Sequence, residues 1–293
     1  MIKKATVLLL ASALLLSACG KNNDSEKNAS ESNSTNVTKP STAEPSKDKP
    51  ADQTTATNET TEPPQQDPPT EESTKDAVIE KKYHMNKVYN IVPNDEGTAK
   101  KVVLLTFDDG PKKAEMINSL IDTLDKHHAK AIFFVNGYRV KENPDLLKLI
   151  HDRDQIIGNH SWDHISLRKE PEAKVKKQIE DVQNIVKDTI GETPVFFRPP
   201  FGEGGDVGKK IAKENGLLYM TWSNGSLDWT LKSKGTDNPN KVISNVLDQL
   251  HAGSNILMHE LPWTVEALDT LLTKLEGKGY SFVDPRSIEL EMR

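Results

Sequence analysis

The chain has a single cysteine among its 293 residues, Cys19, so no disulfide bond can form within it. Its hydrophobic share is also low, at 35%, which indicates that part of the sequence does not pack into a core. The formal net charge is -6 and no dense basic block lies near the centre of the chain. The sequence therefore gives no support to nucleic-acid binding. No internal repeat is evident, and the length allows one large domain or two small ones.

The apolar run near the start of the chain, Val7–Leu16, is too short to span a membrane as a helix. It follows two lysines and ends at Leu16-Ser17-Ala18-Cys19, which resembles a bacterial lipobox. We therefore expect residues 1–19 to be a lipoprotein signal peptide, with Cys19 lipidated and anchored in the membrane. The alternative is an ordinary secretory signal that happens to end near a cysteine.

Residues 20–82 are rich in Ser, Thr, Asn, Pro, Glu and Lys and contain almost no large apolar side chains. Such a composition cannot offset the entropy of ordering, so this segment is predicted to be a disordered linker. A flexible chain of about sixty residues has an r.m.s. reach on the order of 45 Å. A lipid-anchored domain would then work within a cell-wall layer, at the extracytoplasmic face of the bacterial cell membrane. Residues 83–99 regain apolar side chains and are predicted to be a lead-in that packs on a domain formed by residues 100–293.

From residue 100 onward, apolar runs typical of strands alternate with segments that resemble helices. The predicted strands are Val102–Phe107, Ala131–Val135, Gln155–Gly158, Val195–Arg198, Leu217–Trp222, Asn255–Met258 and Tyr280–Val283. The predicted helices are Ala114–His128, Pro144–Arg153, Glu172–Ile190, Val207–Asn215, Pro239–Leu250 and Val265–Gly277. This alternation indicates an α/β fold with a parallel sheet, open or closed into a barrel, whose chemistry lies at the C-terminal ends of the strands.

Two adjacent acids, Asp108 and Asp109, follow the first of these apolar runs and precede Gly110-Pro111. Neighbouring carboxylates at a strand end repel each other unless a cation lies beside them, and a divalent metal is the usual solution. The alternative is a plain Asp-Gly turn after a strand.

A pair of histidines supplies the ligands that a metal at these acids would need. His160 and His164 are spaced i, i+4, so on one face of a helical turn they could bind a single ion. Two imidazoles and one carboxylate form a typical catalytic zinc set with an open position. Thr-Phe-Asp-Asp-Gly followed by His-Ser-Xaa-Xaa-His resembles the polysaccharide deacetylases, the NodB-homology carbohydrate esterases of family four.

Three further motifs follow in the order found in that family. They are Arg198-Pro199-Pro200-Phe201-Gly202, Ser226-Leu227-Asp228-Trp229 and Ile256-Leu257-Met258-His259-Glu260. Taken alone, each has a simpler interpretation: a rigid turn with a surface arginine, a loop acid beside a core aromatic, and a structural histidine. The resemblance covers residues 100–293 and implies a distorted (β/α) barrel with about seven parallel strands.

The resemblance implies a metal-dependent reaction centred on the two acids. Asp109, His160 and His164 would be the metal ligands, Asp108 the general base, and Arg198 the residue that orients that base. Zinc is the expected metal, although cobalt or nickel would also suit such a site. Zinc lowers the pKa of a bound water and polarises a carbonyl group.

The same resemblance assigns the remaining positions to the leaving group and the substrate. His259 would be the general acid, tuned by Asp228, because an amine leaves poorly unless it is protonated. The backbone N–H of Phe201 would face the developing oxyanion. Trp229 and Leu257 would line the pocket for the acetyl methyl group.

Three positions depart from the family pattern. Phe201 stands where a tyrosine is usual, Gly225 where an aspartate is frequent, and Glu260 where an aspartate commonly follows the general acid. These departures affect the substrate contacts and the rate more than the type of reaction.

The sequence thus predicts a polysaccharide N-deacetylase acting on N-acetylglucosamine-type sugars, with peptidoglycan or another cell-surface glycan as substrate. We expect a monomer that contacts the membrane through Cys19 and does not bind nucleic acid. Two alternatives are an O-acetyl esterase with the same metal centre and a non-catalytic glycan-binding lipoprotein. The sequence does not name the glycan, its chain length or the native metal.

Overall fold

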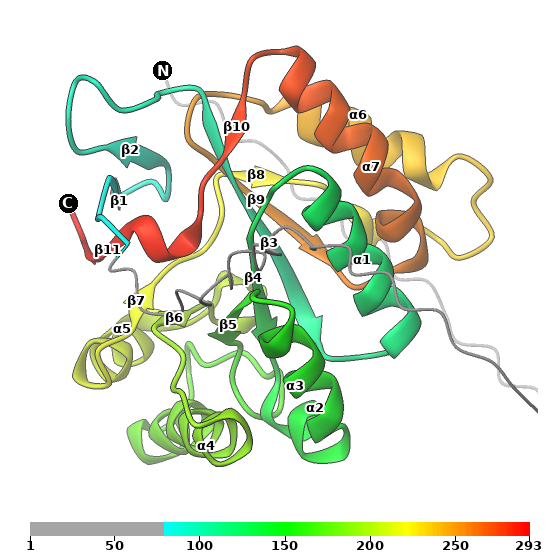
Figure 1. Cartoon of the computed structure of the whole chain (residues 1–293). Helices are drawn as coiled ribbons and strands as arrows, with labels where there is room; N and C mark the ends of the chain where they lie inside the picture. The colour runs from blue at the N-terminus through cyan, green and yellow to red at the C-terminus, as the bar shows by residue number, and fades with distance from the viewer. Residues whose placement is uncertain (1–78) are drawn as a thin grey trace, which may run out of the picture. The chain divides into compact units, whose positions relative to one another are not determined.

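The apolar run that begins at Val102 forms the central strand of a parallel sheet in the computed structural model, which describes residues 79–293 (Figure 1). The predicted signal peptide, the Cys19 anchor and nearly all of the 20–82 linker lie outside the described residues and stay predictions.

Seven parallel strands follow one another in the order β7-β6-β5-β4-β3-β9-β8. Their bounds are β3 (Val102–Gly110), β4 (Ala131–Val135), β5 (Ile156–Asn159), β6 (Phe196–Phe197), β7 (Leu218–Tyr219), β8 (Asn224–Gly225) and β9 (Ser254–His259). An eighth strand, β10 (Ser281–Phe282), pairs with the start of β3. The sheet curls into a half-barrel, and no pairing among the described residues joins β7 to β8. The predicted distorted barrel with about seven parallel strands is confirmed.

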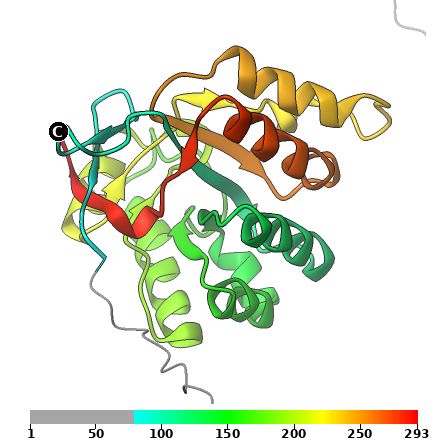
Figure 2. The same cartoon turned by 45° about the horizontal axis from the view of Figure 1, so that its top comes forward.

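Helices cover the outer side of the curled sheet (Figures 1 and 2). They are α1 (Ala114–Lys126), α2 (Gly137–Glu142), α3 (Pro144–Asp152), α4 (Glu172–Ile190), α5 (Gly205–Glu214), α6 (Asn238–Asp248) and α7 (Pro262–Gly277). Single turns of 3-10 helix lie at Pro200–Gly202, Asp228–Thr230 and Pro285–Ser287. None of the helices within residues 79–293 has the length and apolar character to cross a membrane.

Local signals in the sequence set several helix ends. Pro144 occupies the first turn of α3, where its missing N–H costs nothing. Gly191 ends α4 in the left-handed conformation, with φ 82°, which glycine adopts without steric penalty. The short helix α2 was not predicted, because six residues give too little periodicity to detect.

The lead-in segment forms part of a second, small sheet with the C-terminus. β1 (Tyr83–Met85) pairs antiparallel with β2 (Ile91–Pro93) and parallel with β11 (Ile288–Met292), and the three strands lie together in Figure 1. The start and the end of the described chain are therefore joined by backbone hydrogen bonds.

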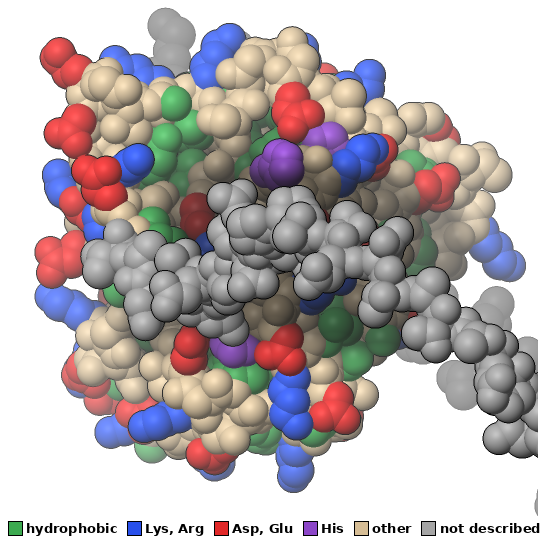
Figure 3. Space-filling model, viewed as in Figure 1, with side chains coloured by type: hydrophobic (Ala, Val, Ile, Leu, Met, Phe, Trp, Pro, Cys, Tyr) green, Lys and Arg blue, Asp and Glu red, His purple; other side chains and the backbone are tan. Residues whose placement is uncertain are grey.

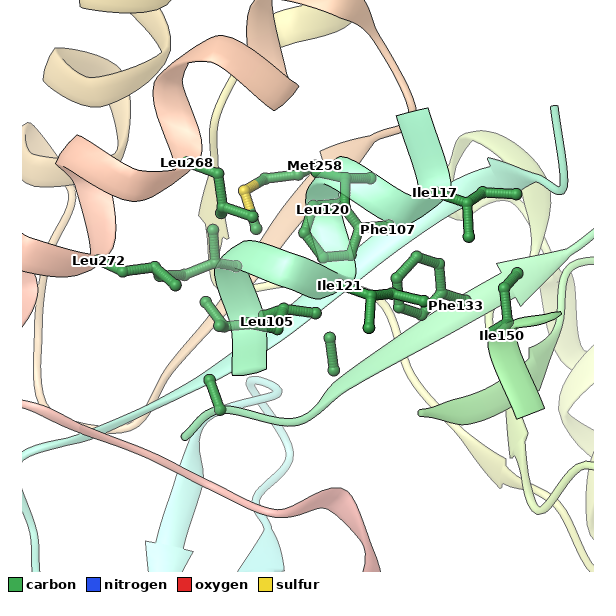
Figure 4. Packing of buried hydrophobic residues seen from close by; sticks show 14 of the residues in the cluster. Leu105, Phe107, Ile117, Leu120, Ile121, Phe133, Ile150, Met258, Leu268 and Leu272 are labelled. Carbon is green, nitrogen blue, oxygen red and sulfur yellow. The ribbon is translucent and has the colours of Figure 1, made fainter. Parts of the chain in front are cut away.

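One hydrophobic core lies between the outer face of the sheet and the helices (Figure 4). Leu105 and Phe107 of β3 and Phe133 of β4 pack there with Leu120 of α1 and Leu268 of α7. All five side chains are almost completely buried. Because strand side chains alternate between faces, the odd-numbered residues of β3 point to this core.

The opposite, inner face of β3 changes from apolar to polar along the strand. Leu104 belongs to a second core that includes Met85 and Ile91 of the small sheet. Thr106 and Asp108 follow on the same face, and both are buried. The small sheet thus fills the inside of the half-barrel at the start of β3, and polar side chains occupy it at the C-terminal end.

Candidate active site

A β-bulge at the end of β3 explains how two successive acids serve one site. Phe107 pairs with Phe133 and Gly110 with Val135, so β3 holds one extra residue over this stretch. In a regular strand Asp108 and Asp109 would point to opposite faces. With the bulge, Asp108 Oδ2 lies 3.7 Å and Asp109 Oδ1 lies 3.4 Å from His160 Nε2.

Asp109, His160 and His164 converge closely enough to share one ion. His164 Nε2 lies 3.0 Å from Asp109 Oδ1, and the three ligand atoms all lie within 4.8 Å of one another. Burial opposes ionisation of Asp109, but the two neighbouring imidazoles, when protonated, hold the pKa of its carboxyl group well below the usual range, as a cation between the three side chains would.

The hydrogen bonds around these three residues fit a divalent cation. His160 Nδ1 lies 2.7 Å from the carbonyl oxygen of Arg198, so this nitrogen carries the proton and Nε2 presents its lone pair towards Asp109. Asp109 Oδ1 is buried and has no hydrogen-bond partner among residues 79–293. A metal site built from histidine and aspartate needs a deprotonated imidazole nitrogen and a carboxylate oxygen that is free to coordinate, and both are present here.

The two histidines do not lie on a helical turn, so that part of the prediction was wrong. Residues 160–166 form an irregular loop in which Ser161 has φ 65° and His164 has φ 54°. Positive φ values cannot continue a right-handed helix. Asn136 instead holds the loop by donating from Nδ2 to the carbonyl oxygen of His160 at 2.8 Å, and Asn159 Oδ1 accepts from the Ser161 N–H.

Arg198 is completely buried and contacts Asp108, as expected of a residue that orients the base, and it does so through a single carboxylate oxygen. Its Nη1 donates to Asp108 Oδ1 at 2.8 Å and to Thr106 Oγ1 at 2.7 Å. Its Nη2 donates to the carbonyl oxygen of Thr221 and to Asn255 Oδ1. The guanidinium group is therefore held by four residues, two from β3, one from β9 and one from the loop after β7, and it forms a buried ion pair with Asp108.

His259 lies opposite Asp108 in the pairing of β3 with β9. Its Nδ1 lies 2.8 Å from Asp228 Oδ1, and its backbone N–H donates to Asp228 Oδ2. Burial lowers the pKa of the imidazole, but the bond to Asp228 offsets this and raises the pKa above its ordinary value. Thr264 Oγ1 also donates to the carboxylate oxygen Oδ2 of Asp228, and Trp263 Nε1 donates to the backbone carbonyl oxygen of Asp228, so both the side chain and the backbone of this residue are held in place.

The three predicted substrate contacts differ in exposure. Phe201 is 63% exposed and its ring packs edge-on against His164, with 4.8 Å between centroids. Trp229 is 42% exposed and packs against His259 at 5.4 Å. Leu257 is buried on β9. The two aromatic rings therefore flank the residues that would carry the chemistry, one on the ligand side and one on the acid side.

Several residues of the site were not predicted from the sequence. Thr106 and Asn255 bind Arg198, Asn136 holds the histidine loop, and Trp222 packs against Trp229 with 6.3 Å between centroids. A polar residue within an apolar strand, such as Thr106 or Asn255, and the position of Asn136 directly after β4 are the signals that could have suggested these residues. Which partner each of them meets depends on the pairing of distant strands.

Acidic and basic side chains are interspersed over the face of the molecule shown in Figure 3, with no continuous basic area among the described residues visible there. A nucleic-acid partner would require such an area. The expectation that the chain does not bind nucleic acid stays a prediction.

The fold and the site define the class of protein. A family model for polysaccharide deacetylases matches residues 95–220. The peptidoglycan-N-acetylmuramic acid deacetylase PdaA of Bacillus subtilis is 31% identical over 200 residues, which cover 67% of this chain and 75% of that protein. The chain belongs to the polysaccharide deacetylase family.

Two similar proteins within this family are named for acting on peptidoglycan. The peptidoglycan-N-acetylglucosamine deacetylase PgdA of Listeria monocytogenes is 40% identical over 184 residues, which cover 62% of this chain but only 38% of that protein. The solved structure of the peptidoglycan N-acetylglucosamine deacetylase Bc1960 is 35% identical, with a TM-score of 0.59, and the match covers 64% of this chain and 87% of that one.

Another solved structure belongs to a protein described as a CE4 family pseudoenzyme from Bacillus anthracis. It is 30% identical, with a TM-score of 0.61, and the match covers 66% of this chain and 67% of that one. The same fold therefore occurs in both enzymes and a pseudoenzyme.

Proposed function

We propose that this protein is a metal-dependent hydrolase that removes N-acetyl groups from N-acetylglucosamine-type polysaccharide, with peptidoglycan as the substrate. The observation that carries this proposal is the convergence of Asp109, His160 and His164 beside an Asp108–Arg198 pair and an Asp228–His259 pair. Peptidoglycan is favoured because relatives from two bacterial genera are named for deacetylating it.

Asp109, His160 and His164 would hold the cation, and zinc is the metal that best suits two imidazoles and one carboxylate. When bound, zinc supplies a polarised carbonyl group and a water of lowered pKa. Cobalt and nickel accept the same donors.

The protein's own groups would move the protons. Asp108 accepts a hydrogen bond from Arg198 through Oδ1, and its Oδ2 lies 3.7 Å from Nε2 of the proposed ligand His160, so Oδ2 can accept the proton of the attacking water. The bond to Asp228 raises the pKa of His259 and so favours its protonated form, and His259 lies opposite Asp108, so it can donate a proton to the leaving amine. The backbone N–H of Phe201 would donate to the oxyanion.

The chain would act at the extracytoplasmic face of the cell membrane, as a monomer anchored through lipidated Cys19. The basis for the location and the anchor is the sequence of the first 19 residues and the composition of the linker that follows. Labelling with palmitate tests the anchor. A Cys19→Ala protein should lose the label and the ability to partition into detergent, and retention of either property would contradict the assignment.

Two other functions use the same scaffold. A non-catalytic glycan-binding role has to be considered because one structural neighbour is described as a pseudoenzyme. The complete set of ligands, base and acid argues against it, since a protein that only binds glycan needs none of these proton-transfer groups. An O-acetyl esterase would use the same centre on an ester, where protonation of the leaving group matters less.

Acetate release across a panel of substrates separates these possibilities. The panel should contain peptidoglycan, chitin oligomers, poly-N-acetylglucosamine and acetylated xylan, with Asp108→Asn as the inactive control. Release from peptidoglycan is the expected result. Release from acetylated xylan alone would indicate the esterase, and tight glycan binding with full metal occupancy and no acetate release would indicate the non-catalytic role.

A further inference from the structure

Glu260 is a buried acid near the site that the proposed chemistry does not use. It follows His259 directly at the end of β9, and it is 1% exposed. Its Oε2 accepts a hydrogen bond from the backbone N–H of Lys112 at 2.8 Å. Its Oε1 is buried and has no hydrogen-bond partner within residues 79–293. Burying a carboxylate with a single hydrogen bond is energetically unfavourable, so we expect this side chain to have a role in the structure.

The contact with Lys112 closes the bulged turn that carries Asp109. On the other side of this turn, the carbonyl oxygen of Gly110 accepts from the backbone N–H of Asn136 at 3.0 Å. The turn is thus tied to β4 through Asn136 and to β9 through Glu260. Asp109 lies between the last regular pair of β3 and these two ties, and its own backbone has φ 66°.

Gly110 is shaped to admit the Glu260 side chain. A Cβ atom added at Gly110 would lie 2.1 Å from Glu260 Oε1, a distance at which one of the two groups must move. The absence of a side chain at position 110 and the long acid at position 260 are therefore complementary.

We propose that Glu260 is a positioning residue that fixes the turn at residues 110–112 and so directs the Asp109 carboxylate towards His160 and His164. It acts through the backbone of the turn and does not touch the metal. The proposal rests on the role proposed above for Asp109 as a ligand. It assigns Glu260 to the metal side of the site, although its neighbour in sequence, His259, is on the acid side.

The proposal is tested by the affinity of metal-free protein for zinc, measured by calorimetry, which does not depend on turnover. Glu260→Met keeps the length of the side chain but removes the acceptor, and it should weaken zinc binding about 10- to 100-fold, as loss of a group that orients a ligand does. Glu260→Gln keeps an acceptor oxygen for the Lys112 N–H and should stay within about threefold of the wild type. Hydrogen exchange at the Lys112 amide should become faster in Glu260→Met only.

Gln155→Met is a matched control for a general loss of stability. Gln155 is 5% exposed, and its Oε1 accepts from the backbone N–H of Ala131 at 3.0 Å, at the opposite end of β4. This variant should lower the melting temperature and leave zinc affinity unchanged. Equal zinc affinity of Glu260→Met and wild type, an equal loss in Glu260→Gln, or an equal loss in Gln155→Met would each overturn the proposal.

Gly110→Ala tests the same contact from the other side if Glu260→Met does not fold. It should displace the Glu260 carboxylate and weaken zinc binding on its own. Where Glu260→Met does fold, the loss in the Gly110→Ala/Glu260→Met double variant should be less than additive because both changes release one turn. Additive losses would contradict the contact. Acetate release by the wild type is measured separately, so zinc binding that depends on Glu260 in a protein that releases no acetate would reject the enzymatic function and keep the positioning role.

Discussion

The two halves of the site use the same arrangement with opposite charges. On the metal side the acid Asp108 lies next to the ligands, and the fully buried Arg198 stands behind it. On the acid side the imidazole of His259 is the more exposed member of its pair, and the fully buried Asp228 lies behind it. Arg198 donates a hydrogen bond to the Asp108 carboxylate, and Asp228 raises the pKa of His259. One half is thereby prepared to accept a proton and the other to donate one.

The largest effect is expected on the metal side. Asp108→Asn removes the group that accepts the proton and leaves the ligands in place, so acetate release should fall by about 10³-fold. Zinc content, measured by elemental analysis, should stay at the wild-type level. Activity close to that of the wild type would show that Asp108 is not the base.

The effect of replacing His259 should depend on the leaving group of the substrate. His259→Gln should reduce deacetylation of an N-acetylated chitin oligomer about 10²-fold, because the amine must be protonated to leave. With an activated aryl acetate, whose phenolate leaves without a proton, the loss should be less than about fivefold. Equal losses on both substrates would mean that His259 does not act as the general acid.

Asp228, the buried partner of His259, should determine the pH range over which the protein is active. The pKa of His259 is raised because the bond to Asp228 outweighs the effect of burial. In Asp228→Asn this pKa falls, so His259 loses its proton at lower pH and the alkaline limb of the rate profile moves to lower pH. Activity at about pH 8 should fall roughly tenfold. An alkaline limb at the wild-type pH would contradict the role of Asp228.

The smallest effect is expected at the exposed aromatic ring beside His259. Trp229→Ala removes a surface on which a sugar can stack, which is worth about 0.5–1.5 kcal/mol and corresponds to a roughly two- to tenfold rise in KM. The change in kcat should be smaller. Val88, a 64% exposed hydrophobic residue in the hairpin between β1 and β2, provides the control, and Val88→Ala should leave KM unchanged.

Local patterns in the sequence predicted the elements that carry the site. The apolar run before Asp108, the run before His259 and the alternation of strands and helices gave the parallel sheet and the edge at which the residues meet. The two-residue strand β8 and the short helix α2 were not predicted, because so few residues do not show the hydrophobic periodicity of a strand or a helix.

The details that bring the side chains together were beyond sequence reasoning. The bulge at Asp108 and the positive φ at His164 are backbone conformations that cannot be deduced from residue type or hydrophobic pattern. The helical turn that we expected at His160 and His164 was therefore wrong. The contact of Glu260 with Lys112 joins residues 148 positions apart. Such contacts depend on the pairing of β3 with β9, which only the folded structure supplies.

Zinc binding by the purified, metal-free protein tests the central claim most directly. We expect one equivalent of zinc to bind to the wild type, and acetate release from peptidoglycan to stop on chelation and return on addition of zinc. Asp109→Ala should lose this binding. Full zinc affinity in Asp109→Ala, or acetate release that continues without metal, would contradict the account.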